Sequence, residues 1–324
     1  MKNLFFLFAI CVLAFSSCMK EEIPVSPHAP GELESKQVEL GIYYSDQVWY
    51  NIENGMEVAR NHKTAWDLAF ENNGPGSRIT INSANIPYIA KTNETDITLV
   101  KDTTGATWYW DEFSGNLDST AIGDWAANPQ IYLLNRGKDE FGKPLGISKL
   151  FIDSTTDNNF YFRYAELSSD VWSSGVINKD SDYFYSYFSL KGTGSQVQIA
   201  PPAKDWDVLF SQYTFVFYDM VPIVPYLVTG VILNPNDPYS LKVFDKNFEA
   251  ISREDIMNPK ANERIDNIGY NFKWYDFDAG YYITDPSKNY IFRNQQGKMF
   301  KIHFLDWYNQ AGEKGSPSFE YSEL

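Results

Sequence analysis

Apolar and polar side chains alternate in short stretches along most of the chain. Every second residue of an extended strand points to the same face, so this alternation predicts strands with one buried side. The clearest stretches cover residues 77–82, 147–152 and 159–164. Two further stretches, 290–293 and 298–304, flank a polar turn that ends in glycine and predict a hairpin.

Helical periodicity is scarce. Only residues 248–257 and 306–310 have the spacing of a short helical turn. Residues 100–130 are rich in Gly, Asp, Thr and Trp, which predicts an extended loop region. The pattern therefore predicts a mostly β fold with few short helices.

One motif occurs twice. Ala65-Trp66-Asp67-Leu68-Ala69-Phe70 and Asp205-Trp206-Asp207-Val208-Leu209-Phe210 each follow an aromatic strand and a glycine turn, the strands being residues 49–52 and 187–190. Three further pairs of blocks recur in the same order: 86–89 with 224–227, 149–152 with 301–304, and 162–167 with 319–324. Four matched blocks predict a duplicated module.

The boundary between the two modules is expected in the polar stretch between Leu167 and Asp182. We therefore expect a first module at residues 39–175 and a second at residues 182–324, each with its own related sheet, in tandem.

The N-terminal residues have the composition of a targeting segment. Residues 1–17 combine Lys2 with an apolar run too short to span a bilayer, which predicts a signal peptide. The run ends in Phe15-Ser16-Ser17-Cys18, which is similar to a bacterial lipoprotein cleavage box and predicts lipidation of Cys18. The alternative is a secretory signal with an incidental cysteine. Residues 23–36 contain Pro24, Pro27 and Pro30 among small polar residues, which predicts a tether, so residues 18–38 are expected to be the lipidated N-terminus and tether.

The tetrapeptide Met19-Lys20-Glu21-Glu22 resembles the short signal that exports lipoproteins of Bacteroidota to the outside of the outer membrane. We therefore expect a lipid-anchored protein of the outer membrane, exposed at the cell surface.

Composition excludes several classes of function. The net charge is −15 and no basic patch is present, which excludes a nucleic-acid footprint. Signal cleavage would remove Cys11 and lipidation would occupy Cys18, so the mature chain would have no free thiol and no disulfide. With three His and no free thiol, the Ser/His/Asp and Cys/His schemes lack a base or a nucleophile. We expect a protein that is not an enzyme.

The two Trp-Asp blocks and the C-terminal pattern of residues 290–324 resemble the HmuY family, the β-rich haem-binding surface lipoproteins of Bacteroidota. The resemblance covers residues 183–324 well and the first module more loosely. It implies a protein that binds haem, or takes it from haem-carrying proteins, and delivers it to a TonB-dependent outer-membrane receptor. The duplication departs from the single module that is typical of the family.

Haem needs an apolar slot and usually one or two axial donors, often His or Met. Met220 opens the apolar run Val221-Pro222-Ile223-Val224-Pro225-Tyr226, whose two prolines a central strand would not accept. This run is expected to be a buried loop or the wall of a pocket. We expect the second module to bind haem, with Met220 and Met257 as axial ligands and Tyr226 in the site. The alternative is that both methionines fill gaps in a core.

The remaining donors are less suited. His28 lies in the tether, and His303 is expected to face solvent, because it alternates with Phe300, Ile302 and Phe304.

A second hypothesis is a surface adhesion or glycan-binding protein on the same fold. It rests on Trp108-Tyr109-Trp110 and Trp125, since aromatic faces stack on sugars as readily as they pack a core. The two hypotheses differ in whether Trp108 and Trp110 line an open groove or are buried.

Overall fold

The structure is a computed structural model that describes residues 31–73, 78–257 and 262–324. The expected signal peptide, the lipidation site Cys18 and His28 lie outside the described residues. Among the described residues, no helix is long and apolar enough to cross a membrane.

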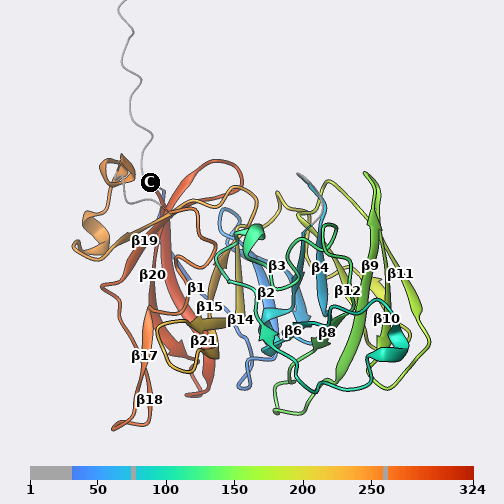
Figure 1. Cartoon of the computed structure of the whole chain (residues 1–324). Coiled ribbons are helices and arrows are strands. Elements are labelled where there is room, and N and C mark those ends of the chain that lie inside the picture. The colour runs from blue at the N-terminus through green and yellow to red at the C-terminus, as the bar shows by residue number, and fades with distance from the viewer. Residues whose placement is uncertain (1–30, 74–77, 258–261) are drawn as a thin grey trace, which may run out of the picture. The chain divides into compact units, whose positions relative to one another are not determined.

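Four antiparallel sheets account for most of the strands, and they follow one another across Figure 1. Sheet 1 has the order β1 (Glu34–Gln37), β21 (Lys314–Glu323), β20 (Met299–Tyr308), β19 (Asn289–Arg293), β16 (Ser240–Val243). Sheet 2 has the order β15 (Val224–Leu233), β14 (Val208–Phe217), β2 (Asp46–Asn51), β3 (Met56–His62).

Sheet 3 has the order β13 (Ser195–Val197), β12 (Tyr185–Ser189), β4 (Leu68–Glu71), β5 (Ile79–Ile81). Sheet 4 has the order β11 (Ser173–Asn178), β10 (Asn159–Glu166), β9 (Ile147–Thr155), β8 (Tyr132–Asn135), β6 (Tyr88–Lys91), β7 (Trp108–Tyr109). A separate hairpin joins β17 (Lys273–Asp276) to β18 (Tyr281–Thr284). The mostly β prediction is confirmed.

Three apolar layers separate the four sheets. Sheets 1 and 2 enclose one core, in which Tyr50 and Phe210 pack on Phe319. Sheets 3 and 4 enclose a second core, in which Phe70 packs on Phe160 and Phe162. The layer between sheets 2 and 3 is built largely from aromatic side chains: Trp49, Trp66, Trp206, Tyr185 and Tyr187. Inward-facing residues of each strand therefore fill a core, as alternation predicts.

The described residues form the short 3-10 helices η1 (Ser83–Asn85), η2 (Ile97–Leu99), η3 (Leu117–Ser119), η4 (Phe248–Ala250) and η5 (Arg253–Met257). Of these, η2 packs on the outer face of sheet 4, and η4 and η5 pack on the outer face of sheet 1. Buried Lys149 and half-buried Lys301 hold η2 and η4 in the same way. Lys149 Nζ donates to the carbonyl of Ile97 at 3.3 Å, and Lys301 Nζ donates to the carbonyl of Phe248 at 2.9 Å. Each carbonyl also accepts a backbone N–H of its own segment, from Val100 and Ile251 respectively, so the lysine adds a second hydrogen bond.

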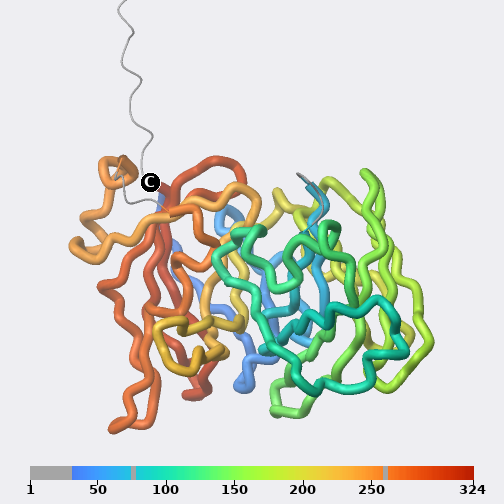
Figure 2. Tube along the Cα trace, viewed as in Figure 1, coloured from blue at the N-terminus to red at the C-terminus, as the bar shows by residue number. Residues whose placement is uncertain are grey.

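Sheets 2 and 3 each combine strands from both predicted modules. β12, from the range 182–324, pairs with β4, and β14 from the same range pairs with β2. The polar stretch between Leu167 and Asp182 also contains β11, which pairs with β10. The tandem arrangement of two self-contained sheets is therefore wrong, because strands cross the predicted boundary in both directions (Figure 2).

Several local predictions are confirmed. β9 and β10 occupy the alternating stretches 147–152 and 159–164, and the predicted hairpin is β19–β20, with Arg293 opposite Met299. Residues 248–257 form η4 and η5.

Two local predictions are wrong. The stretch 306–310 is not a helical turn, because β20 continues to Tyr308. The predicted tether also contains a strand, since β1 pairs with the edge of β21 through main-chain groups that need no apolar side chains.

Candidate functional site

The β14–β15 hairpin projects beyond its sheet. β14 pairs with β15 over its whole length, whereas only Val208, Leu209 and Phe210 pair with β2. β15 is an edge strand, which is where a sheet accepts a proline such as Pro225. The prediction that this run is no central strand is confirmed. The alternative of a buried loop is wrong, because Val221 is 99% exposed.

The β17–β18 hairpin lies against β15 and β20. Lys273 Nζ donates to the carbonyl of Thr229 in β15 at 2.5 Å, and it lies 3.9 Å from the ring centre of Trp307 in β20. The backbone N–H of Tyr282 donates to the Tyr308 hydroxyl at 2.8 Å. Burial lowers the pKa of Lys273 to about 7. This lysine therefore fixes the hairpin beside β15 even though its charged form is disfavoured there.

The segment that leads into β17 also contacts β15 closely. Val231 and Gly269 exchange two backbone hydrogen bonds of 3.0 Å. A Cβ at Gly230 would lie 2.3 Å from the carbonyl oxygen of Gly269. Glycine is therefore required at position 230 for the two segments to approach.

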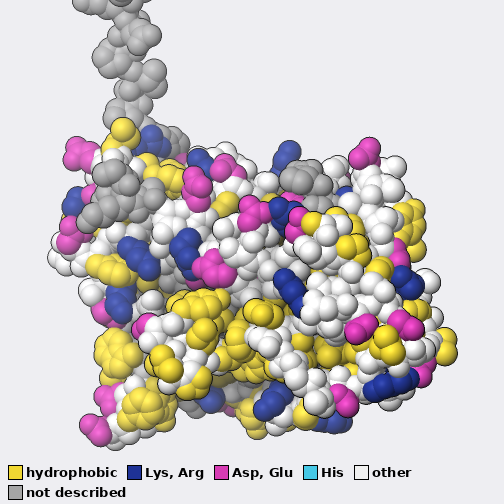
Figure 3. Space-filling view, in the orientation of Figure 1, with side chains coloured by type: hydrophobic (Ala, Val, Ile, Leu, Met, Phe, Trp, Pro, Cys, Tyr) yellow, Lys and Arg dark blue, Asp and Glu magenta, His cyan; other side chains and the backbone are white. Residues whose placement is uncertain are grey.

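Exposed apolar side chains gather on these two neighbouring hairpins. We call this set the aromatic surface: Tyr218, Met220, Val221, Ile223, Tyr226, Trp274, Tyr275, Phe277 and Tyr281. Figure 3 shows hydrophobic side chains over this part of the molecule, at the lower left, where Figure 1 places β17 and β18. Burial raises the pKa of Tyr282, and the nearby Tyr226 raises it further, which places the two hairpins side by side. Clustered exposed apolar groups of this kind mark binding sites in soluble proteins.

The family comparison agrees with the sequence pattern. A family model described as "HmuY protein" matches residues 43–321. The chain belongs to the HmuY family. Members of the HmuY family are haem-binding proteins.

Solved structures similar to this HmuY-family chain include two apo proteins. The Tannerella forsythia apo HmuY analogue has 10% identity, covers 92% of this chain and 99% of its own, and gives a TM-score of 0.30. Apo PinO from Porphyromonas gingivitis has 9% identity, covers 90% of this chain and 97% of its own, and gives a TM-score of 0.28.

A putative lipoprotein from Bacteroides fragilis has 14% identity, covers 54% of this chain and 88% of its own, and gives a TM-score of 0.20. A search of curated proteins gave no match.

The predicted haem ligands of this HmuY-family protein lie in different places. Met220 and Tyr226 belong to the aromatic surface and are 47% and 59% exposed. Met257 ends η5, whose Ile256 packs on the core beside β16, and it is 86% exposed. Figure 1 shows η5 at the upper left, away from the β14–β15 loop. The alternative that both methionines fill a core is wrong, because both are exposed.

His303 is buried, so the prediction that it faces solvent is wrong. Its ring stacks on Phe248 with the ring centres 3.9 Å apart, and its ring nitrogens lie within hydrogen-bond distance of the Pro286 carbonyl and Glu320. The outer face of sheet 1 is covered here by η4. His62 is exposed and pairs with Glu140 at 3.2 Å. Neither histidine belongs to the aromatic surface.

The tryptophans of the glycan hypothesis are mostly packed. Trp108 and Trp110 are half-buried around the ring of Tyr88, and Trp125 is buried in the core between sheets 3 and 4. Only Tyr109 of that segment is exposed.

Sequence reasoning missed the part of the aromatic surface that comes from β17–β18. The available signal was the aromatic run Trp274-Tyr275 with Phe277, followed by a turn that ends in Gly280.

Proposed function

We propose that this protein captures haem on the aromatic surface. The observation that carries the proposal is the gathering of nine exposed apolar side chains on two adjacent hairpins in a member of the HmuY family. A porphyrin is flat and largely apolar, so rings on two neighbouring hairpins can cover its faces.

Two side chains of this surface can donate to iron. Met220 carries a thioether and Tyr226 a phenolic oxygen, and both kinds of group serve as axial ligands in haem proteins. The pairing of Met220 with Met257 stays a prediction. It requires both sulfur atoms to reach the same iron, whereas η5 packs beside β16. The proposed surface does not depend on Met257.

The test is a haem titration of residues 19–324. The expected result is a saturable Soret shift that Met220→Ala changes, together with weaker binding after Phe277→Ser. Met56→Ala serves as the matched control, because Met56 is also exposed but lies on β3. A thioether stabilises reduced iron, so affinity should rise on reduction in the wild type and not in Met220→Ala.

The proposal fails if the wild-type spectrum equals that of free haem mixed with an inert protein. The ligand assignment fails separately if Met220→Ala keeps the wild-type spectrum while Met257→Ala or a histidine variant loses it.

The site of action follows from the expected anchor. A lipid on Cys18 would hold the protein at the outer-membrane surface, where it would pass haem to a TonB-dependent receptor. In cells, Cys18→Ala should release the protein into the medium and abolish palmitate labelling. Unchanged membrane association of this variant would contradict the anchor.

The two halves of the chain are further proposed to derive from one duplicated module whose aromatic strands have been exchanged. Support comes from β2 and β12, which occupy corresponding places beside β14 and β4. The glycan alternative keeps only Tyr109 as an exposed aromatic of its segment, so haem capture is favoured.

A further inference from the structure

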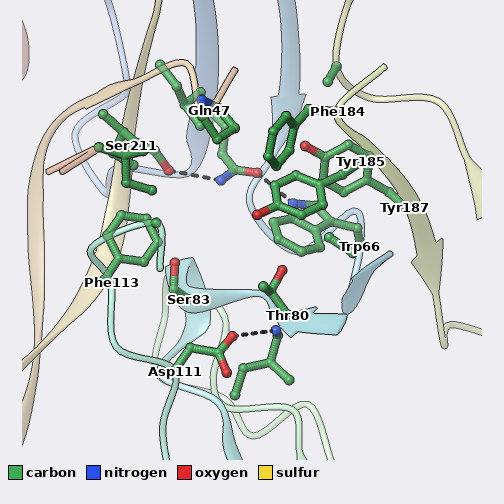
Figure 4. A pocket seen from close by; sticks show the side chains of 18 of the residues that line it. Gln47, Trp66, Thr80, Ser83, Asp111, Phe113, Phe184, Tyr185, Tyr187 and Ser211 are labelled. Carbon is green, nitrogen blue, oxygen red and sulfur yellow. Dashed lines mark hydrogen bonds between the residues drawn. The ribbon is translucent and has the colours of Figure 1, made fainter. Parts of the chain in front are cut away.

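A pocket separate from the aromatic surface lies in the layer between sheets 2 and 3. Its cavity volume is about 120 Å³, and the pocket is partly open to solvent. Figure 4 shows Trp66, Phe184, Tyr185 and Tyr187 on one side and Phe113 and Ser83 on the other. Ligand pockets commonly have such an aromatic lining, and they favour the seams between packed units.

The pocket has a rigid polar frame. Gln47 donates to the Ser211 hydroxyl at 2.9 Å and accepts from Trp66 Nε1 at 2.8 Å. The carboxylate of Asp111 accepts the backbone N–H groups of Ile81 at 2.8 Å and Ala121 at 2.7 Å. These bonds fix the walls before any molecule enters, which lowers the entropic cost of binding.

Four hydroxyl groups that line the pocket are not used by this frame. The side chains of Thr80, Ser83, Tyr185 and Tyr187 have no hydrogen-bond partner among the described residues. Burial raises the pKa of both tyrosines, so both stay neutral and can donate. A molecule in the pocket would therefore meet free donors within an otherwise apolar wall.

The charges around the pocket decide which molecules it accepts. Asp111 and Glu112 line it, and the described residues of the lining include no Lys, Arg, His, Met or Cys. Arg264 balances Glu112 from outside the lining at 2.9 Å. A carboxylate- or sulfonate-bearing molecule would meet Asp111 without a compensating cation. The propionates of haem are disfavoured for the same reason.

We propose that this pocket is a second binding site, separate from the aromatic surface, for an uncharged, flat, largely aromatic molecule whose polar group bonds to Tyr187 or Tyr185. The flat rings of Trp66, Tyr187 and Phe113 supply stacking faces, and the free hydroxyls supply orientation.

Two fluorescent probes with the same ring system, one uncharged and one anionic, test this. N-phenyl-1-naphthylamine is uncharged, and its 8-sulfonate is an anion of the same ring system. Residues 19–324 should bind the uncharged probe saturably at one site, with energy transfer from tryptophan, and should bind the sulfonate at least tenfold more weakly. Equal affinity for the two probes, or no saturable binding, overturns the proposal.

Variants locate the bound probe. Thr80 faces the pocket from the middle of β5, whose neighbours Ile79 and Ile81 face the other core. Thr80→Phe should fill the space and weaken the uncharged probe at least tenfold, and Tyr187→Phe should weaken it about fivefold by removing one hydrogen bond. Tyr161→Phe, at an exposed tyrosine of β10, is the control. Wild-type probe binding in Thr80→Phe would place the probe elsewhere and overturn the assignment.

A structural readout covers the case in which Thr80→Phe does not fold. Crystals of the wild type soaked with 4-bromophenol should give an anomalous bromine peak between Trp66 and Phe113. A peak only at the aromatic surface would overturn the proposal. The haem titration is independent of it, because Tyr187→Phe should leave the Soret shift unchanged.

Discussion

Asp67 and Asp207 accept the same kind of hydrogen bond, each from the opposite half of the chain. The backbone N–H of Leu190 donates to Asp67 Oδ2 at 2.6 Å, and that of Ile52 donates to Asp207 Oδ2 at 2.8 Å. Asp67 thus fixes the end of the aromatic strand 187–190, which precedes the second Trp-Asp motif. Asp207 fixes the end of the aromatic strand 49–52, which precedes the first motif. The pair differs in one respect. Arg136 contacts Asp67 at 2.8 Å, whereas the described residues give Asp207 no basic partner.

This difference predicts that replacing each aspartate by neutral asparagine lowers the free energy of unfolding by a different amount. Asp67→Asn leaves the nearly buried Arg136 without its carboxylate and should lower the free energy of unfolding by about 3–5 kcal/mol. Asp207→Asn breaks hydrogen bonds only and should cost about 1–3 kcal/mol. Urea unfolding measures both, with exposed Asp205→Asn as the control. A larger cost for Asp207→Asn than for Asp67→Asn would contradict the assignment.

The cost at Asp207 should also depend on pH. Burial raises the pKa of this carboxyl in the folded state, so its contribution is fully present below the unfolded pKa and is lost as pH rises through the folded pKa. The penalty of Asp207→Asn should therefore be larger at pH 4 than at pH 7. A penalty that grows between these values would show that burial does not dominate.

Lys273 predicts a pH dependence of stability in the alkaline range. Its pKa falls to about 7 on folding, so between about pH 7 and 10 the unfolded chain holds a proton that the folded chain lacks. Stability should therefore rise with pH in this range and stay flat with respect to this group below pH 7. Urea unfolding from pH 7 to 9.5 should show the slope in the wild type and in exposed Lys204→Met, but not in Lys273→Met.

His303 should be important for stability and not for haem. His303→Ala removes a stacked ring and two polar contacts in a buried position, which should cost about 2–4 kcal/mol. Exposed His62→Ala should cost less than about 1 kcal/mol. Neither variant should alter the Soret spectrum. Loss of haem binding in folded His303→Ala would move the site to sheet 1.

The strand exchange predicts that neither half folds alone. Residues 39–175 would leave β2 without β14 and β4 without β12, and residues 182–324 would lack the same partners. Each half expressed separately should give a collapsed, poorly dispersed NMR spectrum, and mixing the halves should restore dispersion. A well-dispersed spectrum from one half would show that the exchange is not required.

Local patterns predicted the strands but not their partners. Alternation identifies a strand because it reports on one residue and its neighbours, and this located β9, β10 and the β19–β20 hairpin. Pairing depends on segments far apart in sequence. The aromatic strand before each Trp-Asp block could pair with either block, and no local signal distinguishes the two.

Two other errors have specific physical causes. β20 has register shifts between Phe304 and Tyr308, and such bulges interrupt the alternation, so residues 306–310 did not resemble a strand. Alternation places the His303 side chain on the other face of the strand from Phe304. It does not show that η4 covers the face of the sheet on which His303 lies. A sheet face is solvent-exposed only if no other element packs on it.

One matched pair of blocks needs correction for a similar reason. Asn82 Nδ2 donates to the carbonyl of Trp66 at 2.8 Å, and Asn234 Nδ2 donates to the carbonyl of Trp206 at 2.8 Å. Asn82 and Asn234 are therefore the corresponding residues, and the match of 86–89 with 224–227 is wrong. The β14–β15 hairpin is longer than the β4–β5 hairpin that follows the first Trp-Asp block, which short sequence matches could not reveal.

The segment before β2 protects an edge that would otherwise be open to other molecules. Backbone bonds run from Gly31, which donates to Glu323 at 2.9 Å, to Leu40, which donates to Gly315 at 2.8 Å, so this segment follows the whole of β21. A chain that begins at residue 39 would expose β21, a ten-residue strand, with unpaired main-chain groups along its edge. Such an edge is a template for another copy of the same strand. Shortened forms should therefore associate and precipitate, so the solubility of the protein depends on residues whose own side chains are mostly exposed.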